Sequence, residues 1–153
     1  MTEILYRLGE VDDLHAVHVL NQALFAEAWS KQSLLDVMLS GFDLYVAEAQ
    51  GVLVGYILSQ DILDETHIMQ VAVSSDFQRQ GIAKRLSQML FNAKPKGTTF
   101  MLEVRRSNRA AQVLYRKLGF QEVGCRKNYY IPLAGDNQRE DAILMSFTLP
   151  SKP

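Results

Sequence analysis

An apolar strand that runs into a glycine-containing loop and then a helix is the segment of this sequence best suited to chemistry. Val71–Val73 ends the apolar run, and Gly81 and Ala83 open an amphipathic segment. The first amides of a helix have no partner inside it, and the aligned peptide dipoles place partial positive charge there. Gly81 lets a ligand approach the backbone, and Ala83 keeps the next turn narrow. Arg79, Lys84 and Arg85 add positive charge. The pattern predicts an anion site, although a glycine at such a junction also occurs in ordinary turns.

Two familiar phosphate-binding motifs do not match this junction. No Gly-Lys-Ser/Thr follows Gly81 to grip a nucleotide phosphate and its magnesium ion, so a P-loop is excluded. The three-glycine pattern of a dinucleotide-binding fold is incomplete, and the surrounding chain is not a run of strand-helix-strand repeats. This junction alone therefore does not distinguish an anion site from an ordinary turn, and the residues further downstream provide the additional evidence.

A carboxylate inside an apolar strand and a tyrosine on a following helix are the candidate acid and base residues. Glu103 interrupts the apolar run Phe100–Val104, where a charge is costly unless it is paired or faces a cleft. A salt bridge to Arg105 or Arg106 is the structural alternative for this carboxylate. Tyr115 stands at helical spacing from apolar neighbours, which is equally typical of a core aromatic. The pair can supply a base and an acid, or can simply stabilise the fold.

Apolar periodicity and turn signals predict a mixed α/β chain that positions these residues. The expected strands are Ile4–Leu8, Leu44–Ala49, Val52–Gln60, His67–Val73, Thr98–Val104, Phe120–Tyr130 and Ala142–Leu149. The expected helices are Leu14–Leu24 after a cap at Asp12 or Asp13, a helix from Ser30 to about Ser40, Ile82–Leu90 and Asn108–Leu118. This order predicts a mixed sheet of about seven strands with about four helices distributed over both faces.

Length and composition indicate a single domain. With 153 residues and 48% hydrophobic content, the chain can bury one core but is too short for two ordinary ones. We expect one domain over residues 1–149 and a frayed tail over residues 150–153. A formal net charge of -1 gives no general basic field, so nucleic acid is not expected as a partner.

Cysteine, histidine and hydropathy patterns narrow the class of protein further. Cys125 is the only cysteine, so no internal disulfide is expected, and its place in an expected strand predicts a buried, inert thiol. The three histidines lack a nearby set of cysteines or carboxylates, so we expect no metal site. Met1–Glu10 has no apolar signal core and no long hydrophobic run follows, so we expect a cytoplasmic protein without a membrane partner.

Two motifs together carry a resemblance to a known family. Gln78–Ala83 resembles the acetyl-coenzyme A pyrophosphate loop of the GNAT (Gcn5-related) N-acetyltransferases, and Asn108–Phe120 is similar to the second cofactor motif of that family. Glu103–Arg105, Asn128–Tyr130 and Arg139–Ile143 resemble the RimI-type branch, whose members acetylate the N-terminal alanine of a small-subunit ribosomal protein. The resemblance covers most of the chain and implies the α+β GNAT fold.

The resemblance implies a set of cofactor contacts. In the family the sheet is splayed where the strand ending in Val73 meets the strand ending in Val104, and acetyl-coenzyme A lies in the opening. Main-chain groups of Val71, Ala72 and Val73 are then expected to hold the pantetheine arm and to polarise the thioester carbonyl. The pyrophosphate is expected at Arg79, Gln80, Gly81, Ile82, Ala83 and Lys84. Asn108, which also has the character of a helix cap, is expected to add a cofactor contact.

The resemblance also implies catalytic roles. Glu103 is expected to be the general base, directly or through water, and Tyr115 the general acid beside the coenzyme sulfur. The amine is expected to attack the thioester directly in a ternary complex. A route through an acetylated cysteine would need an activated thiol, and Cys125 has no histidine within the motif regions.

The expected acceptor is the N-terminal alanine of a ribosomal protein. Tyr130 and Asp141, on either side of the polar loop Ala134–Glu140, are expected to bind it, although a solvated hairpin loop explains the segment equally well. Neutralising an amine at pH 7 costs about 1.1 kcal/mol for an N-terminus and about 4.6 kcal/mol for a lysine, given their ordinary pKa values. Two alternatives stay open: a GNAT enzyme for a small amine or a lysine, and a non-catalytic module that binds acetyl-coenzyme A.

Overall fold

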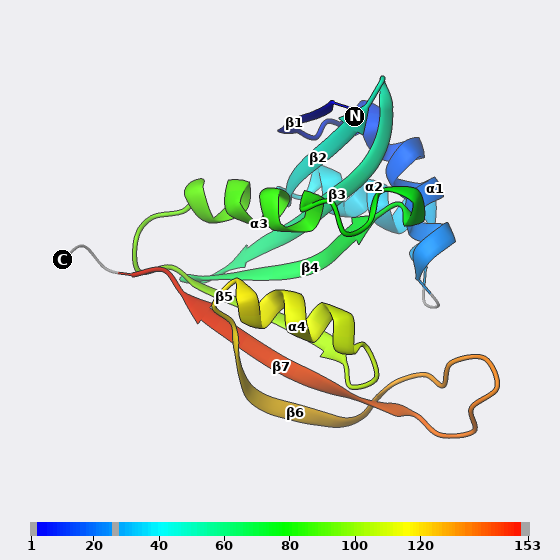
Figure 1. Ribbon diagram of the computed structural model, residues 1–153, viewed down its shortest axis with the longest axis vertical. Coiled ribbons are helices and arrows are strands. Elements are labelled where there is room, and N and C mark those ends of the chain that lie inside the picture. The colour runs from blue at the N-terminus through cyan, green and yellow to red at the C-terminus, as the bar shows by residue number, and fades with distance from the viewer. Residues whose placement is uncertain (1–2, 26–27, 151–153) are drawn as a thin grey trace. The chain divides into compact units, whose positions relative to one another are not determined.

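Seven strands and four α-helices make up the computed structural model within the residues it describes, 3–25 and 28–150 (Figure 1). The strands are β1 (Ile4–Leu8), β2 (Asp43–Ala49), β3 (Val52–Ile62), β4 (Glu65–Val73), β5 (Thr99–Arg105), β6 (Gln121–Tyr130) and β7 (Glu140–Thr148). The α-helices are α1 (Leu14–Leu24), α2 (Lys31–Leu39), α3 (Ile82–Asn92) and α4 (Arg109–Lys117), with short 3-10 turns η1 (Val11–Asp13) and η2 (Ser75–Phe77). Every expected element is present, with small shifts at the ends.

The strands form a mixed sheet in the order β1-β2-β3-β4-β5-β7-β6. β4 pairs with β5 in parallel, from Glu65 opposite Thr99 to Ile68 opposite Leu102. The pairs β1–β2, β2–β3, β5–β7 and β6–β7 are antiparallel. The prediction of a mixed sheet with the GNAT strand and helix content is therefore confirmed.

Internal contacts divide the chain into two compact units. The first unit contains the described residues up to Asp61 together with Met69–Lys94. The second contains Ile62–Ile68 and the described residues from Pro95 onward. The single domain over residues 1–149 stays a prediction. Of the expected frayed tail, residues 151–153 lie outside the described residues.

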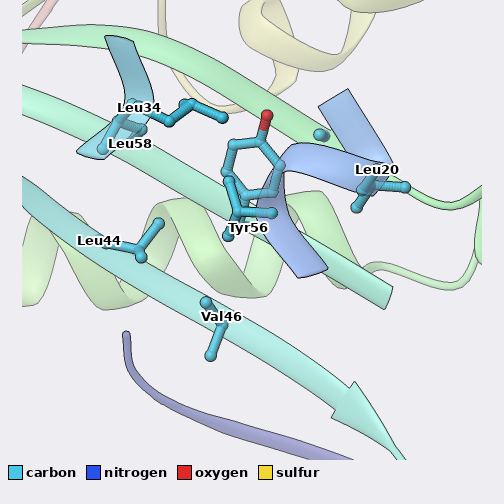
Figure 2. Close-up of a cluster of buried hydrophobic side chains, with 8 residues drawn as sticks. Leu20, Leu34, Leu44, Val46, Tyr56 and Leu58 are labelled. Atoms are coloured by element: carbon cyan, nitrogen blue, oxygen red, sulfur yellow. The ribbon is translucent and has the colours of Figure 1, made fainter. Parts of the chain in front are cut away.

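The core of the first unit lies between helices and the strands β2, β3 and β4. Its buried members come from α1, α2 and one face of these strands (Figure 2): Val17, Leu20, Leu34, Leu44, Val46, Tyr56, Leu58 and Ala72. On the other face, a Cβ placed on Gly55 would lie 3.2 Å from the Ile82 side chain and 3.5 Å from that of Leu86. Glycine therefore allows α3 to approach β3 closely. Helices cover both faces of the strands in this unit, as the sequence predicts.

Capping side chains explain where two of the helices begin. Ser30 accepts a hydrogen bond at 3.1 Å from the amide three residues later, at the start of α2. Asn108 does the same at 3.1 Å for α4. α1 follows Asp13 as expected, but the Asp13 carboxylate accepts from the Arg7 guanidinium and from Glu10 N instead of from α1. The predicted start of α1 is confirmed, but the predicted capping hydrogen bond from Asp13 is wrong, because the Arg7 guanidinium is a charged donor and engages the carboxylate instead.

Aromatic side chains link α4 to the strands of the second unit. The Phe120 ring contacts Tyr115 of α4 edge-on at 5.8 Å and Phe147 of β7 at 5.6 Å. Phe147 in turn stacks on Phe100 of β5 at 6.2 Å. Between α4 and β6, Gly119 has a φ of 108°, and a Cβ there would lie 2.9 Å from the Phe147 ring. Only glycine suits both the conformation and the close approach.

Cys125 lies exposed on β6, which corrects the prediction of a buried thiol. β6 is the last strand in the sheet order, and nearly all of its residues are exposed. The Arg106 guanidinium donates to Cys125 Sγ at 3.4 Å. Hydrophobic pattern alone does not distinguish an outer strand of this kind from a covered one.

Neither a membrane-spanning helix nor a metal-binding cluster is found in the described part of the chain. Within residues 3–25 and 28–150, no helix combines the length and the apolar character needed to cross a bilayer. In the same residues, no three His, Cys, Asp or Glu side chains are grouped so as to hold a metal ion.

Candidate functional site

The loop between β4 and α3 presents main-chain amides to an open surface. Arg79 and Gly81 adopt left-handed conformations, with φ values of 65° and 79°. Nothing lies within 4 Å of a Cβ placed on Gly81. The first hydrogen bond of α3 runs from Arg85 N to Gly81 O at 3.0 Å, so the three intervening amides precede the helical ladder. An open, amide-lined helix start of this kind fits a phosphate group.

Side chains around this loop either support its shape or add charge to it. Ile82 is 2% exposed, so its buried side chain anchors the loop, and any contact of this residue with a ligand must come through its main chain. Gln78 Nε2 donates to Val73 O at 3.0 Å and ties the loop to the end of β4. The exposed members of the expected pyrophosphate set are Arg79, Gln80, Gly81 and Lys84, while Ala83 is half-buried. Arg79 and Lys84 therefore supply the positive charge beside the amides.

The end of β4 offers main-chain groups rather than polar side chains. Ala72 is buried in the core of the first unit, whereas Val71 and Val73 are half-buried on the other side of the strand. Directly after the strand, Ser74 N donates to Val54 O at 2.7 Å and fixes the exit of the chain. Any ligand contact at these three residues must come through the backbone or the two valine side chains.

Glu103 lies half-buried on β5 and forms an ion pair with Arg126 of β6. Its Oε1 is 3.2 Å from Arg126 Nε, and the two side chains are 29% and 57% exposed. The sequence offered an ion pair with Arg105 or Arg106 as the structural alternative. An ion pair is present, but neither of these arginines is the partner. Arg105 pairs with Glu140 at 3.1 Å, and Arg106 is 3.3 Å from an Asp141 oxygen. The pairing of β5, β7 and β6 brings a different arginine to the carboxylate.

Tyr115 keeps its proton firmly at neutral pH. Burial raises the pKa of its hydroxyl, and the nearby Tyr130 raises that pKa further. The ring packs edge-on against Phe120, as a core aromatic would, and its role as a proton donor stays a prediction. Asn108, at the other end of α4, acts as the cap that its sequence position predicts. Its cofactor contact stays a prediction.

The two expected acceptor residues have different surroundings. The Tyr130 ring lies under the Arg105 guanidinium at 4.5 Å and meets the Tyr129 ring edge-on at 5.0 Å. The Asp141 carboxylate is engaged by the protein itself, accepting from Asn128 N at 2.9 Å and from Arg106 at 3.3 Å. The hydrogen bond from Asn128 N is the main reason that the pKa of Asp141 lies below its ordinary value, and the Arg106 charge adds to it. Tyr130 offers an aromatic surface, whereas Asp141 holds the backbone.

A surface hollow adjoins these residues in the second unit. The loop between β6 and β7 extends beyond the paired strands (Figure 1). The hollow has a volume of about 580 Å³ and is lined by Ser107, Leu133, Gly135, Asp136, Asn137, Gln138, Arg139 and Glu140. Small-molecule pockets commonly have volumes of about 300–1,000 Å³. The polar loop between the two expected acceptor residues therefore lines a concave surface.

Two arginines of this region were missed in the sequence. Arg126 pairs with Glu103, and Arg139 donates to the main-chain oxygens of Asn128 and Tyr129. Both depend on which residues of β6 and β7 face each other, and that register includes two irregularities. The signals in the sequence were the place of Arg139 at the start of the motif Arg139–Ile143 and the place of Arg126 two residues before the motif Asn128–Tyr130.

Comparisons with known proteins agree with this geometry. The sequence model of the acetyltransferase (GNAT) domain matches residues 10–129. The [ribosomal protein bS18]-alanine N-acetyltransferase of Escherichia coli K12 is 34% identical over 142 residues, covering 92% of this chain and 94% of the relative. The enzyme of the same name from Haemophilus ducreyi is 36% identical over 139 residues, with 90% and 94% covered. The crystal structure of the ribosomal-protein-S18-alanine N-acetyltransferase from Escherichia coli superposes with a TM-score of 0.89 at 31% identity, covering 99% of this chain and 97% of that one.

Proposed function

The chain belongs to the GNAT acetyltransferase family, and from this premise we propose that it acetylates the N-terminal alanine of ribosomal protein bS18, with acetyl-coenzyme A as donor. The observation that carries the choice of acceptor is the identity of 34% and 36%, over nine-tenths of the chain, with enzymes named for that reaction. A ribosomal-protein acceptor also implies that the protein works in the cytoplasm.

Donor binding is assigned to the first unit. Acetyl-coenzyme A supplies an activated acetyl thioester and carries a pyrophosphate. The amides that open α3, with Arg79 and Lys84 beside them, have the charge and openness that a pyrophosphate requires. Main-chain groups of Val71–Val73 hold the pantetheine arm and polarise the thioester carbonyl. Asn108 is proposed to add a further cofactor contact, and no metal ion takes part.

Proton transfer is assigned to the second unit. Glu103 takes a proton from the acceptor ammonium, directly or through one water molecule, and the neutral amine attacks the thioester carbonyl carbon. Tyr115, whose raised pKa keeps its hydroxyl protonated at neutral pH, donates that proton to the sulfur as the carbon–sulfur bond breaks, and the nitrogen releases its second proton to water as the amide forms. A single carboxylate is a sufficient base for an N-terminal amine, because deprotonating this amine at pH 7 costs only about 1.1 kcal/mol. The partly exposed Arg126 must give up its contact with the carboxylate, and exposed pairs of this kind are weak.

Acceptor binding is assigned to Tyr130 and Asp141. The Tyr130 ring offers an apolar face to a small first residue such as alanine, and the hollow beside the β6–β7 loop offers room for the residues that follow. Asp141 contributes from β7 by holding the backbone before Tyr130, through the hydrogen bond that it accepts from Asn128 N. A small methyl side chain suits a flat aromatic surface better than a long or charged one does.

A panel of acceptors tests the proposal. Acetyl transfer from acetyl-coenzyme A is measured with short peptides that start with alanine, serine or methionine, with a peptide of the bS18 N-terminal sequence, and with polyamines. Matched peptides with a blocked N-terminus and an internal lysine serve as controls. We expect turnover of free alanine N-termini, and blocking should abolish it. A preference for polyamines or lysines would show that the acceptor is a small amine or a lysine and not an N-terminal alanine. Cofactor binding without any acetyl transfer would favour a non-catalytic module that binds acetyl-coenzyme A.

A further inference from the structure

β6 carries a bulge directly before the residues assigned to the acceptor. The pairing passes from Arg126 opposite Ala142 to Tyr130 opposite Glu140, so residues 127–129 face residue 141 alone. Asn128, in the middle of the bulge, has a φ of 55°, in the left-handed region. A bulge of this kind removes main-chain groups from the ladder and re-aims the side chains beside it.

Two side chains of the hairpin take the place of the missing ladder bonds. Arg139 Nε donates to Asn128 O at 3.0 Å, and Arg139 Nη2 donates to Tyr129 O at 3.1 Å. From the other side, Asp141 Oδ1 accepts from Asn128 N at 2.9 Å. The planar guanidinium spans two successive carbonyl oxygens, a geometry that a lysine ammonium does not reproduce.

The bulge lies between the proposed acceptor surface and the proposed base. Tyr129 and Tyr130 follow its centre, and their rings meet edge-on at 5.0 Å. Arg126, on the other side of the bulge, lies over the Tyr129 ring at 5.5 Å and pairs with Glu103 at 3.2 Å. A change in the path of residues 127–129 would therefore move both tyrosine rings.

We propose that Arg139 is a positioning residue for acceptor selection, which fixes the bulge of β6 and thereby the placement of Tyr130. Asp141 acts in the same way through Asn128 N, rather than by contact with the acceptor. The inference rests on the proposed function and deepens it. It assigns the preference for a small first residue to the shape of the backbone at residues 127–129 as well as to the Tyr130 ring.

The test compares Arg139→Ala and Arg139→Lys with the intact chain. We expect KM for an alanine-starting peptide to rise about tenfold in both variants, with kcat changed less than about threefold and acetyl-coenzyme A affinity unchanged, because binding of the acceptor alone is disturbed. The preference for alanine over serine and methionine peptides should narrow. Arg116→Ala is the matched control, since this arginine of α4 is exposed and 3.9 Å from Glu122. It should leave KM unchanged.

A double variant identifies the route of the effect. If Arg139 acts through Tyr130, Arg139→Ala combined with Tyr130→Ala should have the KM of Tyr130→Ala alone. The positioning role would be overturned if the KM increases of the two single variants multiplied in the double variant. It would also be overturned if Arg139→Lys had the KM of the intact chain. An Arg139→Ala variant with unchanged KM and unchanged peptide preference would also overturn the positioning role. The proposed function would still stand in that case, provided that the intact chain acetylates alanine peptides. An intact chain that acetylates no N-terminus overturns the proposed function and this inference with it.

Discussion

Glu103 Oε1 and Arg126 Nε lie 3.2 Å apart, so the proposed base is ion-paired across two strands of the second unit. Both side chains are partly exposed, at 29% and 57%, and such pairs contribute about 0–1 kcal/mol. The arginine therefore orders the carboxylate without holding it strongly. In the proposed mechanism, the incoming ammonium group replaces the guanidinium as the partner of Glu103.

Glu103→Gln separates proton transfer from binding. The amide has nearly the same shape but cannot take a proton, so we expect kcat at pH 7 to fall about 100-fold or more. Calorimetric affinity for acetyl-coenzyme A should stay the same. Arg126→Gln serves as the control, because it removes the weak partner and keeps the carboxylate, and its kcat should change less than about fivefold. Transfer at the intact rate by Glu103→Gln would exclude Glu103 as the base.

Sequence patterns predicted the elements of the fold because the signals for them are local. Ser30 and Asn108 are capping residues within four positions of the bonds they form, and Gly81 stands at the turn that its φ of 79° requires. The strand order also agrees with the predicted mixed sheet. Each of these features depends on a few neighbouring residues or on the order of the elements.

Side-chain partners in the second unit depend on register, which no local signal encodes. Arg126 reaches Glu103, and Asp141 bonds to Asn128 N, because of where bulges fall in the pairing of β6 with β7. The exposure of Cys125 has the same origin, since it follows from the outer place of β6 in the sheet. The residues near the proposed acceptor surface were therefore harder to predict than the loop that opens α3.

Tyr115→Phe tests the proposed acid. The ring can keep its edge-on contact with Phe120, so we expect little change in stability or in acetyl-coenzyme A affinity. We expect kcat to fall about tenfold to 100-fold, because the departing thiolate loses its proton donor. Stopped-flow single turnovers with bound acetyl-coenzyme A measure this step directly. A variant with poor cofactor affinity but normal turnover of the bound complex would show that Tyr115 supports packing instead.

Gly81→Ala tests the anion site independently of catalysis. Gly81 has a φ of 79° and Gly41 a φ of 87°, and a Cβ on either would meet nothing within 4 Å. Both alanine variants should therefore lose about 1 kcal/mol of stability from backbone strain. Only Gly81→Ala should weaken acetyl-coenzyme A binding, by about tenfold, because its methyl group stands where the backbone must approach the ligand. Equal affinities in the two variants would contradict a pyrophosphate site at this loop.

Tyr56 gives the first unit a predictable loss of stability at high pH. Burial raises the pKa of Tyr56 to about 12, partly offset by the hydrogen bond from Asn21. Between pH 10 and 12 the unfolded chain releases this proton while the folded chain keeps it, so stability falls as pH rises, by up to roughly 3 kcal/mol. Denaturant unfolding at several pH values should show a shallower decline for Tyr56→Phe. The same variant should be less stable by about 0.5–1.5 kcal/mol at pH 8, because the hydrogen bond from the hydroxyl to the Gln70 oxygen at 2.8 Å is lost, while Asn21 still donates to that oxygen. Tyr129→Phe, exposed on β6, is the control, and equal slopes in all three proteins would contradict the assignment.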